Sequence, residues 1–200
     1  KVMESFSSLD IKVPVTAREW HIWWGAPLGT DPSVPAWEHW KGLKRFGKFD
    51  PTTTIEETIP GSAWRRYLNC VGYPLLGPYD SGQEDIIRWQ LETARNAGLE
   101  CLHIHLWPSI WDDGTDFTPL PVFDKALSVA EKMNYPIAVH DEIMFRKSNI
   151  TKAQVLENTI ARTTSLIKNY GAHPGWQKME GMPVYYFQNS NKWLSAEDMQ

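Results

Sequence analysis

A histidine and two acids stand where one strand-like run of the sequence ends. The segment "VHDEIMFR", residues 139–146, begins as a buried apolar strand and continues into His140, Asp141 and Glu142. Glu142 falls just past the strand, the position from which barrel enzymes take site residues. An ionised carboxylate there accepts strong, directional hydrogen bonds. The sequence therefore indicates an acid aimed into a pocket, with a solvated acid ahead of a helix as the alternative.

A second strand-like run carries a pair of histidines. In "ECLHIHLW", residues 100–107, alternation puts His103, His105 and Trp107 on one face. A strand-end H-x-H is also how many metal-dependent hydrolases supply two metal ligands, and His140 or the acid after it would be the third. Because no fixed spacing marks that third ligand, we favour histidines that donate and accept hydrogen bonds at a polar barrel mouth.

Tryptophan is unusually frequent in this chain. Eleven of the 200 residues are tryptophan, and several stand beside proline or glycine in apparent loops. A core does not need so many, whereas a flat apolar ring with one N–H donor suits the C–H face and hydroxyls of a sugar. The composition therefore favours a carbohydrate ligand.

Strands and helices alternate along the chain, which predicts parallel pairing through right-handed crossovers. The strand-like runs are residues 19–24, 100–107, 136–141 and 183–188, and the helical runs are about 82–97, 121–134 and 151–171. This spacing is that of a (β/α)₈ barrel. Four strands cannot close such a barrel, so the sequence predicts an α/β fold in which residues 1–200 form the N-terminal half of a TIM barrel, strands 1–4. A complete four-stranded α/β domain is the alternative.

Capping residues and apolar stripes define the helices. Ser81 with Glu84, and Thr151 with Gln154, match the capping-box pattern. The stripes expected to face the core are Ile87, Leu91 and Ala94, then Phe123, Leu127 and Ala130, and last Leu156, Ile160, Thr163 and Ile167.

A long aromatic segment separates the first strand from the first helix. Residues 25–80 are too many for an ordinary βα loop, and they hold Trp37, Trp40, Trp64, Tyr67, Tyr73 and Tyr79. In a barrel the βα loops form the face where active sites lie. This loop is expected either to wall a cleft at the barrel mouth or to pack over the barrel as a structural excursion.

Charge and cysteine content exclude several classes of function. The formal net charge of −4 argues against nucleic acid as a partner, and no apolar stretch approaches the roughly 18 residues of a membrane span. Cys70 and Cys101 lie too far apart for a metal motif. We expect no cofactor. The chain starts at Lys1 and not at Met, which suggests that an N-terminal segment has been removed.

Six segments taken in order resemble glycoside hydrolase family 99, the endo-α-mannosidase family, from about residue 20 to 200. "HIWWGAP" is similar to that family's Y-x-x-W-Y-G-N-P strand, and "YPLLGPYDSGQEDIIRWQLETARNAG" to its Y-P-x-L-G-x-Y-x-S-x-D and following helix. "HLWP" stands where Ser-Trp-Tyr-Pro would, and "VHDEIMF" resembles His-x-Glu-Pro-Tyr. "IKNYGAHPGW" and "MPVYYFQNSN" resemble Y-G-x-H-P-x-[FY] and P-x-x-Y-x-Y-D-S.

The resemblance implies a (β/α)₈ barrel that cleaves glycosidic bonds with retention, using two carboxylates from later strands, beyond residue 200. The half seen here would supply the sugar-binding walls and Glu142, a carboxylate that holds substrate hydroxyls. The expected substrate-binding residues are Glu142, His140, Trp24, His21, Tyr79, His103, His105 and Trp107, with no metal ligands.

Departures from the family pattern leave the sugar open. His21 stands in for an aromatic residue, Ile143-Met144 for Pro-Tyr, and Gln188-Asn189-Ser190 for Tyr-Asp-Ser. We therefore predict a glycoside hydrolase that acts on an oligo- or polysaccharide, mannan or another glycan, in a secreted, periplasmic or secretory-pathway location. The alternatives are a metal-dependent hydrolase built on His103, His105 and His140, and a non-catalytic sugar-binding barrel.

Overall fold

A computed structural model describes the parts of the chain that carry the regular structure. These are residues 17–22, 24–26, 40, 51–52, 65, 68, 70, 73–106, 120–143, 150–188 and 194–198. Trp107 and most of the long aromatic segment lie outside the described residues, so the expectations for them stay predictions.

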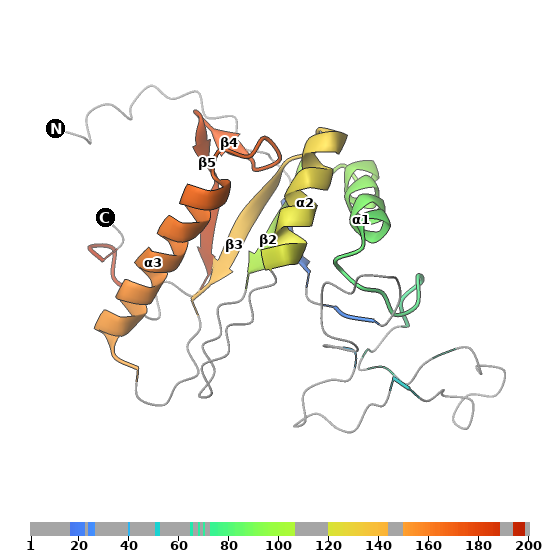
Figure 1. Ribbon diagram of the computed structural model, residues 1–200, viewed down its shortest axis with the longest axis horizontal. Coiled ribbons are helices and arrows are strands. Elements are labelled where there is room, and N and C mark those ends of the chain that lie inside the picture. Colours follow the sequence, from blue (N-terminus) through green and yellow to red (C-terminus); the bar gives the residue numbers. More distant parts are fainter. Residues whose placement is uncertain are drawn as a thin grey trace.

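Within these ranges, parallel strands form one sheet in the order β1-β2-β3-β6. The strands are β1 (Ala17–His21), β2 (Cys101–Leu106), β3 (Ile137–Glu142) and β6 (Tyr185–Gln188). The helices α1 (Glu84–Asn96), α2 (Leu120–Met133) and α3 (Lys152–Tyr170) follow β1, β2 and β3 in the chain. They cover one face of the sheet (Figure 1). This is the arrangement that strand–helix alternation predicts.

The sheet has two faces of opposite character, which we call the helix face and the polar face. On the helix face, alternate strand residues pack with the apolar stripes of α1 and α2 into one core. Its fully or almost fully buried members include Ile22, Ile87, Leu91, Ile104, Leu106, Phe123, Leu127, Ile137 and Val139. The polar face carries the residues between them: Glu19, His21, His103, His105, His140, Glu142, Tyr186 and Gln188.

The strand boundaries differ from the expected ones, and the fourth strand, β6, begins at Tyr185 and not at residue 183. β1 is Ala17–His21, so the strand begins and ends earlier than the predicted residues 19–24. Glu142, expected just past the third strand, is the last residue of β3. Ahead of β6 the chain also forms a small antiparallel hairpin, β4 (Lys178–Met179) with β5 (Met182–Pro183), which the sequence did not indicate.

One predicted capping box is confirmed and the other is wrong. Thr151 caps α3, accepting from the Gln154 backbone N–H at 3.3 Å while the Gln154 side chain accepts from the Thr151 N–H at 2.9 Å. The cap of α1 is instead Gln83, with no side-chain cap bond. Ser81 is used elsewhere: its hydroxyl accepts from the Trp24 N–H at 3.1 Å, and its own N–H donates to the Trp24 carbonyl at 2.7 Å.

The stripe predicted for α3 is wrong by one position. Ile160 and Ile167 are 56% and 41% exposed, whereas the buried residues of α3 are Val155, Thr159 and Leu166. Helical spacing adds Arg162 to this buried face. The apolar pattern of the sequence does not indicate this position, because arginine is charged and is seldom part of a protein core. The stripes predicted for α1 and α2 are confirmed.

Arg162 lies on this face with its side chain 16% exposed, and it pairs with an acid of the sheet. Its Nε lies 3.0 Å from Asp141 Oδ2, and the Tyr185 hydroxyl donates to the same oxygen. Burial raises the pKa of Asp141, against the opposing effects of Arg162 and Tyr185. Asp141 therefore joins β3, α3 and β6 on the helix face and is turned away from the histidines.

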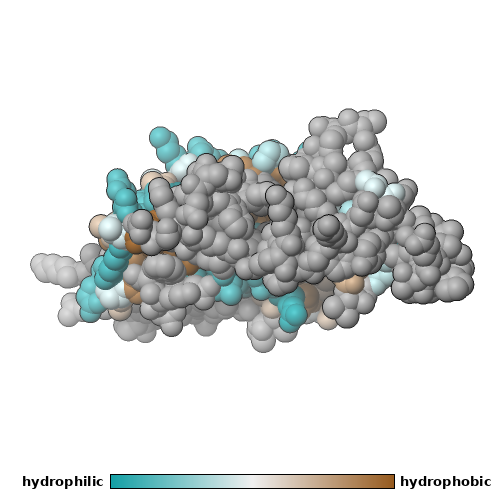
Figure 2. Space-filling model, turned by 90° about the horizontal axis from the view of Figure 1, so that it is seen from below, coloured by the Kyte–Doolittle hydropathy of each residue, from teal (hydrophilic) through white to brown (hydrophobic). Residues whose placement is uncertain are grey.

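Figure 2 shows one face of the molecule. Where described residues are visible on it, hydrophilic and hydrophobic ones lie next to one another. No helix in the described part of the chain has both the length and the apolar character that a membrane crossing requires.

The Asp141–Arg162 pair predicts a large effect of a single substitution. Arg162→Met keeps an apolar stem but leaves the Asp141 carboxylate buried without its cation, so we expect a loss of about 3–5 kcal/mol in the free energy of unfolding. Urea denaturation followed by circular dichroism measures it. The matched control is Arg88→Met, whose partner Glu84 is exposed, and for which a clearly smaller loss is expected because water screens an exposed pair. Equal effects for the two variants would contradict this account.

Candidate functional site

The parallel register places four polar-face side chains in one row across the sheet. His21 is the partner of His105, His105 of His140, and His140 of Tyr186. Because the strands are parallel, their carboxyl ends lie at the same edge, where open α/β sheets bind ligands. Residues that are far apart in sequence thus meet in one histidine-rich site at the ends of the strands.

His105 is the centre of this site. Its Nδ1 lies 2.6 Å from Glu19 Oε1 and its Nε2 lies 3.2 Å from Glu142 Oε2, while the residue is only 4% exposed. The rings of His21 and His140 stand on either side, with centroids 4.8 and 5.1 Å from that of His105. A buried imidazole is thereby held between two carboxylates.

Glu142 is part of the site and not of the surface. It is 8% exposed, and its register partner on β6 is Gln188. The alternative of a solvent-facing acid is therefore wrong. The orientation of a buried carboxylate at a strand end is set before a ligand binds. Such a carboxylate is suited to accept directional hydrogen bonds from hydroxyl groups.

Burial and mutual repulsion lower the pKa of three of the histidines. Burial is the largest cause for His21, His103 and His140, followed by a like-charge effect of His105 on His21 and His140 and of His140 on His103. Glu19 and Glu142 act in the opposite direction on His21 and His140. His21, His103 and His140 are thus favoured as neutral imidazoles, each with one donor and one acceptor nitrogen.

His103 lies on the same face but has a different neighbour. Its ring stacks on Tyr186 with centroids 4.2 Å apart and an interplanar angle of 22°. In the described residues, the cluster of ligand atoms close enough to share a cation is Glu19, His21 and His105. The set imagined for a metal-dependent hydrolase, His103, His105 and His140, is therefore not the one that the structure gathers.

A second group of predicted residues forms an aromatic cluster. Trp24 and Trp40 lie with ring centroids 4.4 Å apart, and Trp40 meets Tyr79 edge-on at 5.2 Å. The Trp40 Nε1–H donates to the Tyr79 carbonyl at 2.9 Å. Burial raises the pKa of Tyr79, against a hydrogen bond with Gln90. Trp40 is the buried member, while Trp24 and Tyr79 stay half-buried and keep surface for a ligand.

The main residue that the sequence analysis missed is Glu19. It precedes His21 by two positions on β1, so alternation puts both on the polar face, beside His103 and His105. The signal was present in "EWHIWW", but placing the strand at 19–24 made Glu19 look like a terminal residue. Gln188, named in the sequence analysis only as a departure from the family pattern, is the register partner of Glu142 on β6.

Comparison with known proteins gives a family and a fold. The model of glycosyl hydrolase family 99 matches residues 16–198. Two solved structures of a family 99 endo-α-mannosidase from Bacteroides thetaiotaomicron, one in complex with bis-tris-propane, are similar at 21% identity, with TM-scores of 0.56 and, for the complex, 0.54. A search of curated proteins found no match.

These likenesses confirm the predicted fold. Each covers 88% of this chain but only 46% or 42% of the solved chain, so the chain spans less than half the length of these relatives. Its parallel sheet, with α1 to α3 on one face, corresponds to the first half of a (β/α)₈ barrel.

The aromatic cluster predicts that Trp40 supports its neighbours. Trp40→Ala removes a buried ring and its bond to the Tyr79 carbonyl, so we expect a loss of about 3–5 kcal/mol in the free energy of unfolding. Urea denaturation followed by near-ultraviolet circular dichroism checks this. Trp89→Ala, at a ring on α1 that is 41% exposed, is the control and is expected to cost clearly less. A Trp40→Ala variant as stable as the parent would show that the cluster is not packed as described.

Proposed function

This chain belongs to glycosyl hydrolase family 99, and from that membership we propose that it provides the substrate-binding half of a retaining glycoside hydrolase. The substrate is an oligo- or polysaccharide, and an α-mannoside is the first candidate because the similar solved structures are endo-α-mannosidases. The carboxylates that cleave the bond belong to later strands of the barrel in this proposal.

The observation that carries the proposal is the buried Glu142 at the end of β3. Its carboxylate, together with His140 and Gln188, lines the polar face where parallel strands end. Sugars present many hydroxyl donors, and an ionised carboxylate is the strongest acceptor that a protein offers them. Glu142 would fix the position of the sugar ring, and the catalytic pair would then act on a bond already in place.

The aromatic cluster supports the same proposal. Trp24 and Tyr79 are half-buried rings held by Trp40 and by the bonds between Ser81 and Trp24. A fixed ring face suits the C–H face of a pyranose, and fixing it beforehand lowers the entropy cost of binding. Trp107 would add a third ring in this proposal.

The proposal also covers the cellular location of the protein and the identity of its sugar substrate. A glycan substrate favours a secreted, periplasmic or secretory-pathway enzyme. His21 and Gln188 occupy positions where the family pattern has other side chains, and both are on the polar face. We propose that these two residues adapt the site to the particular glycan.

The proposal predicts the effect of one isosteric change. Glu142→Gln keeps the shape of the side chain but removes the charge, and a hydrogen bond to a charged group contributes about 1.5–3 kcal/mol. We therefore expect kcat/KM of the intact protein on its glycan to fall about 10–100-fold. Initial rates on a panel of α-mannosides and other oligosaccharides provide the measurement.

The Glu142→Gln experiment has a matched control and two outcomes that would contradict the proposal. Glu92→Gln changes an exposed acid on α1 and is expected to leave kcat/KM as it is. Kinetics of Glu142→Gln equal to those of the parent protein would remove Glu142 from the substrate site. Binding of a glycan without turnover by the parent protein would instead favour a non-catalytic sugar-binding barrel.

A further inference from the structure

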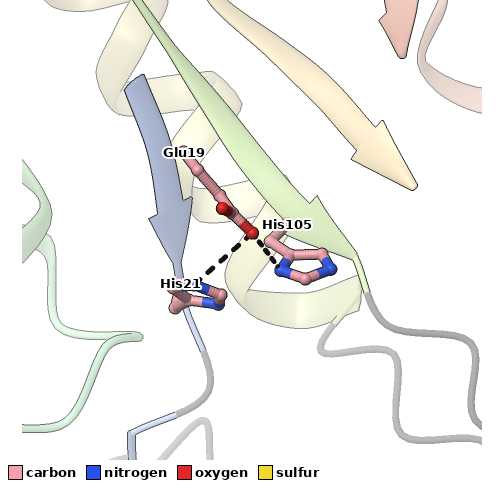
Figure 3. Close-up of side chains that lie close together, drawn as sticks. All are labelled: Glu19, His21 and His105. Carbon is pink, nitrogen blue, oxygen red and sulfur yellow. Dashed lines mark ion pairs between the residues drawn. The ribbon is translucent and has the colours of Figure 1, made fainter. Parts of the chain in front are cut away.

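Three polar-face side chains at the ends of β1 and β2 converge on one point. Glu19 and His21 come from β1 and His105 comes from β2, and their ligand atoms all lie within 4.8 Å of one another. Figure 3 shows the Glu19 carboxylate directed between the two imidazole rings. We propose that Glu19, His21 and His105 form a binding site for a divalent transition-metal ion of the zinc type.

The backbone places these ligands without help from a flexible loop. Glu19 and His21 are two residues apart on one strand and so share a face, and His21 is the register partner of His105 on the next strand. Neighbouring strands lie about 4.8 Å apart. Sites built on strands are positioned more accurately than sites on loops, so the protein holds two imidazoles and a carboxylate together before an ion binds.

The donor set selects the kind of ion. Two imidazole nitrogens and one carboxylate oxygen suit Zn²⁺ and its transition-metal neighbours, whereas Ca²⁺ and Mg²⁺ require shells composed mainly of oxygen. Three protein ligands also leave a position open for water or a ligand hydroxyl, as in zinc sites that act on substrates.

Binding of an ion would bring the three ligand atoms, which lie within 4.8 Å of one another, to a more even spacing. Tetrahedral zinc bonds of 2.0–2.1 Å put ligand atoms about 3.3 Å apart. His21 Nε2 is 3.5 Å from Glu19 Oε1, close to that spacing, but His105 Nδ1 is only 2.6 Å from it. The Glu19 side chain is 35% exposed, so it has room to move outward by the fraction of an ångström required.

Glu142 gives His105 the partner that a metal-bound histidine usually has. A histidine that binds a metal through one ring nitrogen typically donates its other N–H to a carboxylate, which fixes the orientation of the ring. His105 Nε2 is 3.2 Å from Glu142 Oε2, while its Nδ1 is directed at Glu19 and His21. The same carboxylate that we propose for sugar binding would therefore also orient the metal ligand.

The competing interpretation is a hydrogen-bonded cluster without an ion. In it, a doubly protonated His105 donates to both carboxylates, with His140 stacked on its other side. The two interpretations differ in one measurable property, which is affinity for a metal. The proposal does not depend on glycosidase activity, because metal binding is measured directly and without a glycan.

The experiment is a titration of the intact protein after removal of metals with a chelator. Calorimetry with Zn²⁺ is expected to give one ion per chain, and Co²⁺ is expected to give the visible absorption of a four-coordinate site. Glu19→Gln and His21→Asn should each weaken Zn²⁺ binding at least 100-fold. Glu142→Gln should weaken it about 10–100-fold, the usual effect of removing a carboxylate that orients a ligand.

A histidine outside the proposed ligand set provides the control. His173→Asn changes a histidine that lies beside Glu131. This variant should bind Zn²⁺ as the parent protein does. Circular dichroism checks that every variant is folded, and the half-exposed His21 keeps the test decisive if the buried His105 cannot be replaced. Absence of Zn²⁺ binding, or binding unaffected by Glu19→Gln and His21→Asn in folded variants, would overturn the proposal.

Discussion

The two-sidedness of the parallel sheet is the constraint on which the rest of this structure depends. Each strand sends alternate side chains to opposite faces. One set is mostly apolar and is buried by α1 and α2, while the other set is rich in histidines and carboxylates. Register then turns these local alternations into a row of side chains across the strands. Without the buried helix face, nothing would hold the charged residues of the polar face so close together.

Asp141 and Glu142 show that the face of the sheet on which an acid lies determines its role. They are neighbours in sequence and both are buried, but they lie on opposite faces. Asp141 meets Arg162 and Tyr185 and joins a helix to two strands. Glu142 meets His105 and lines the polar face. A structural acid and a site acid thus differ by a single step along one strand.

Much of this arrangement could be predicted from the sequence, because periodicity and alternation are local properties. The order of strands and helices, the stripes of α1 and α2 and the cap at Thr151 all followed from them. The errors arose where a distant partner overrides a local pattern. Ser81 bonds to Trp24 instead of capping α1, and Arg162 enters the buried face of α3 because Asp141 is there. Glu19 gained its place only once the register of β1 and β2 was known.

The paired bonds between Ser81 and Trp24 have a consequence for how this protein can change over evolutionary time. These bonds join two residues that are 57 positions apart in sequence. The residues between them therefore form a loop whose two ends are fixed. The entropy cost of closing a loop grows only slowly with its length. Insertions and deletions inside this loop would therefore be tolerated while Trp24 and Tyr79 keep their positions. The length of the stretch between these two points can therefore change without rebuilding the sheet.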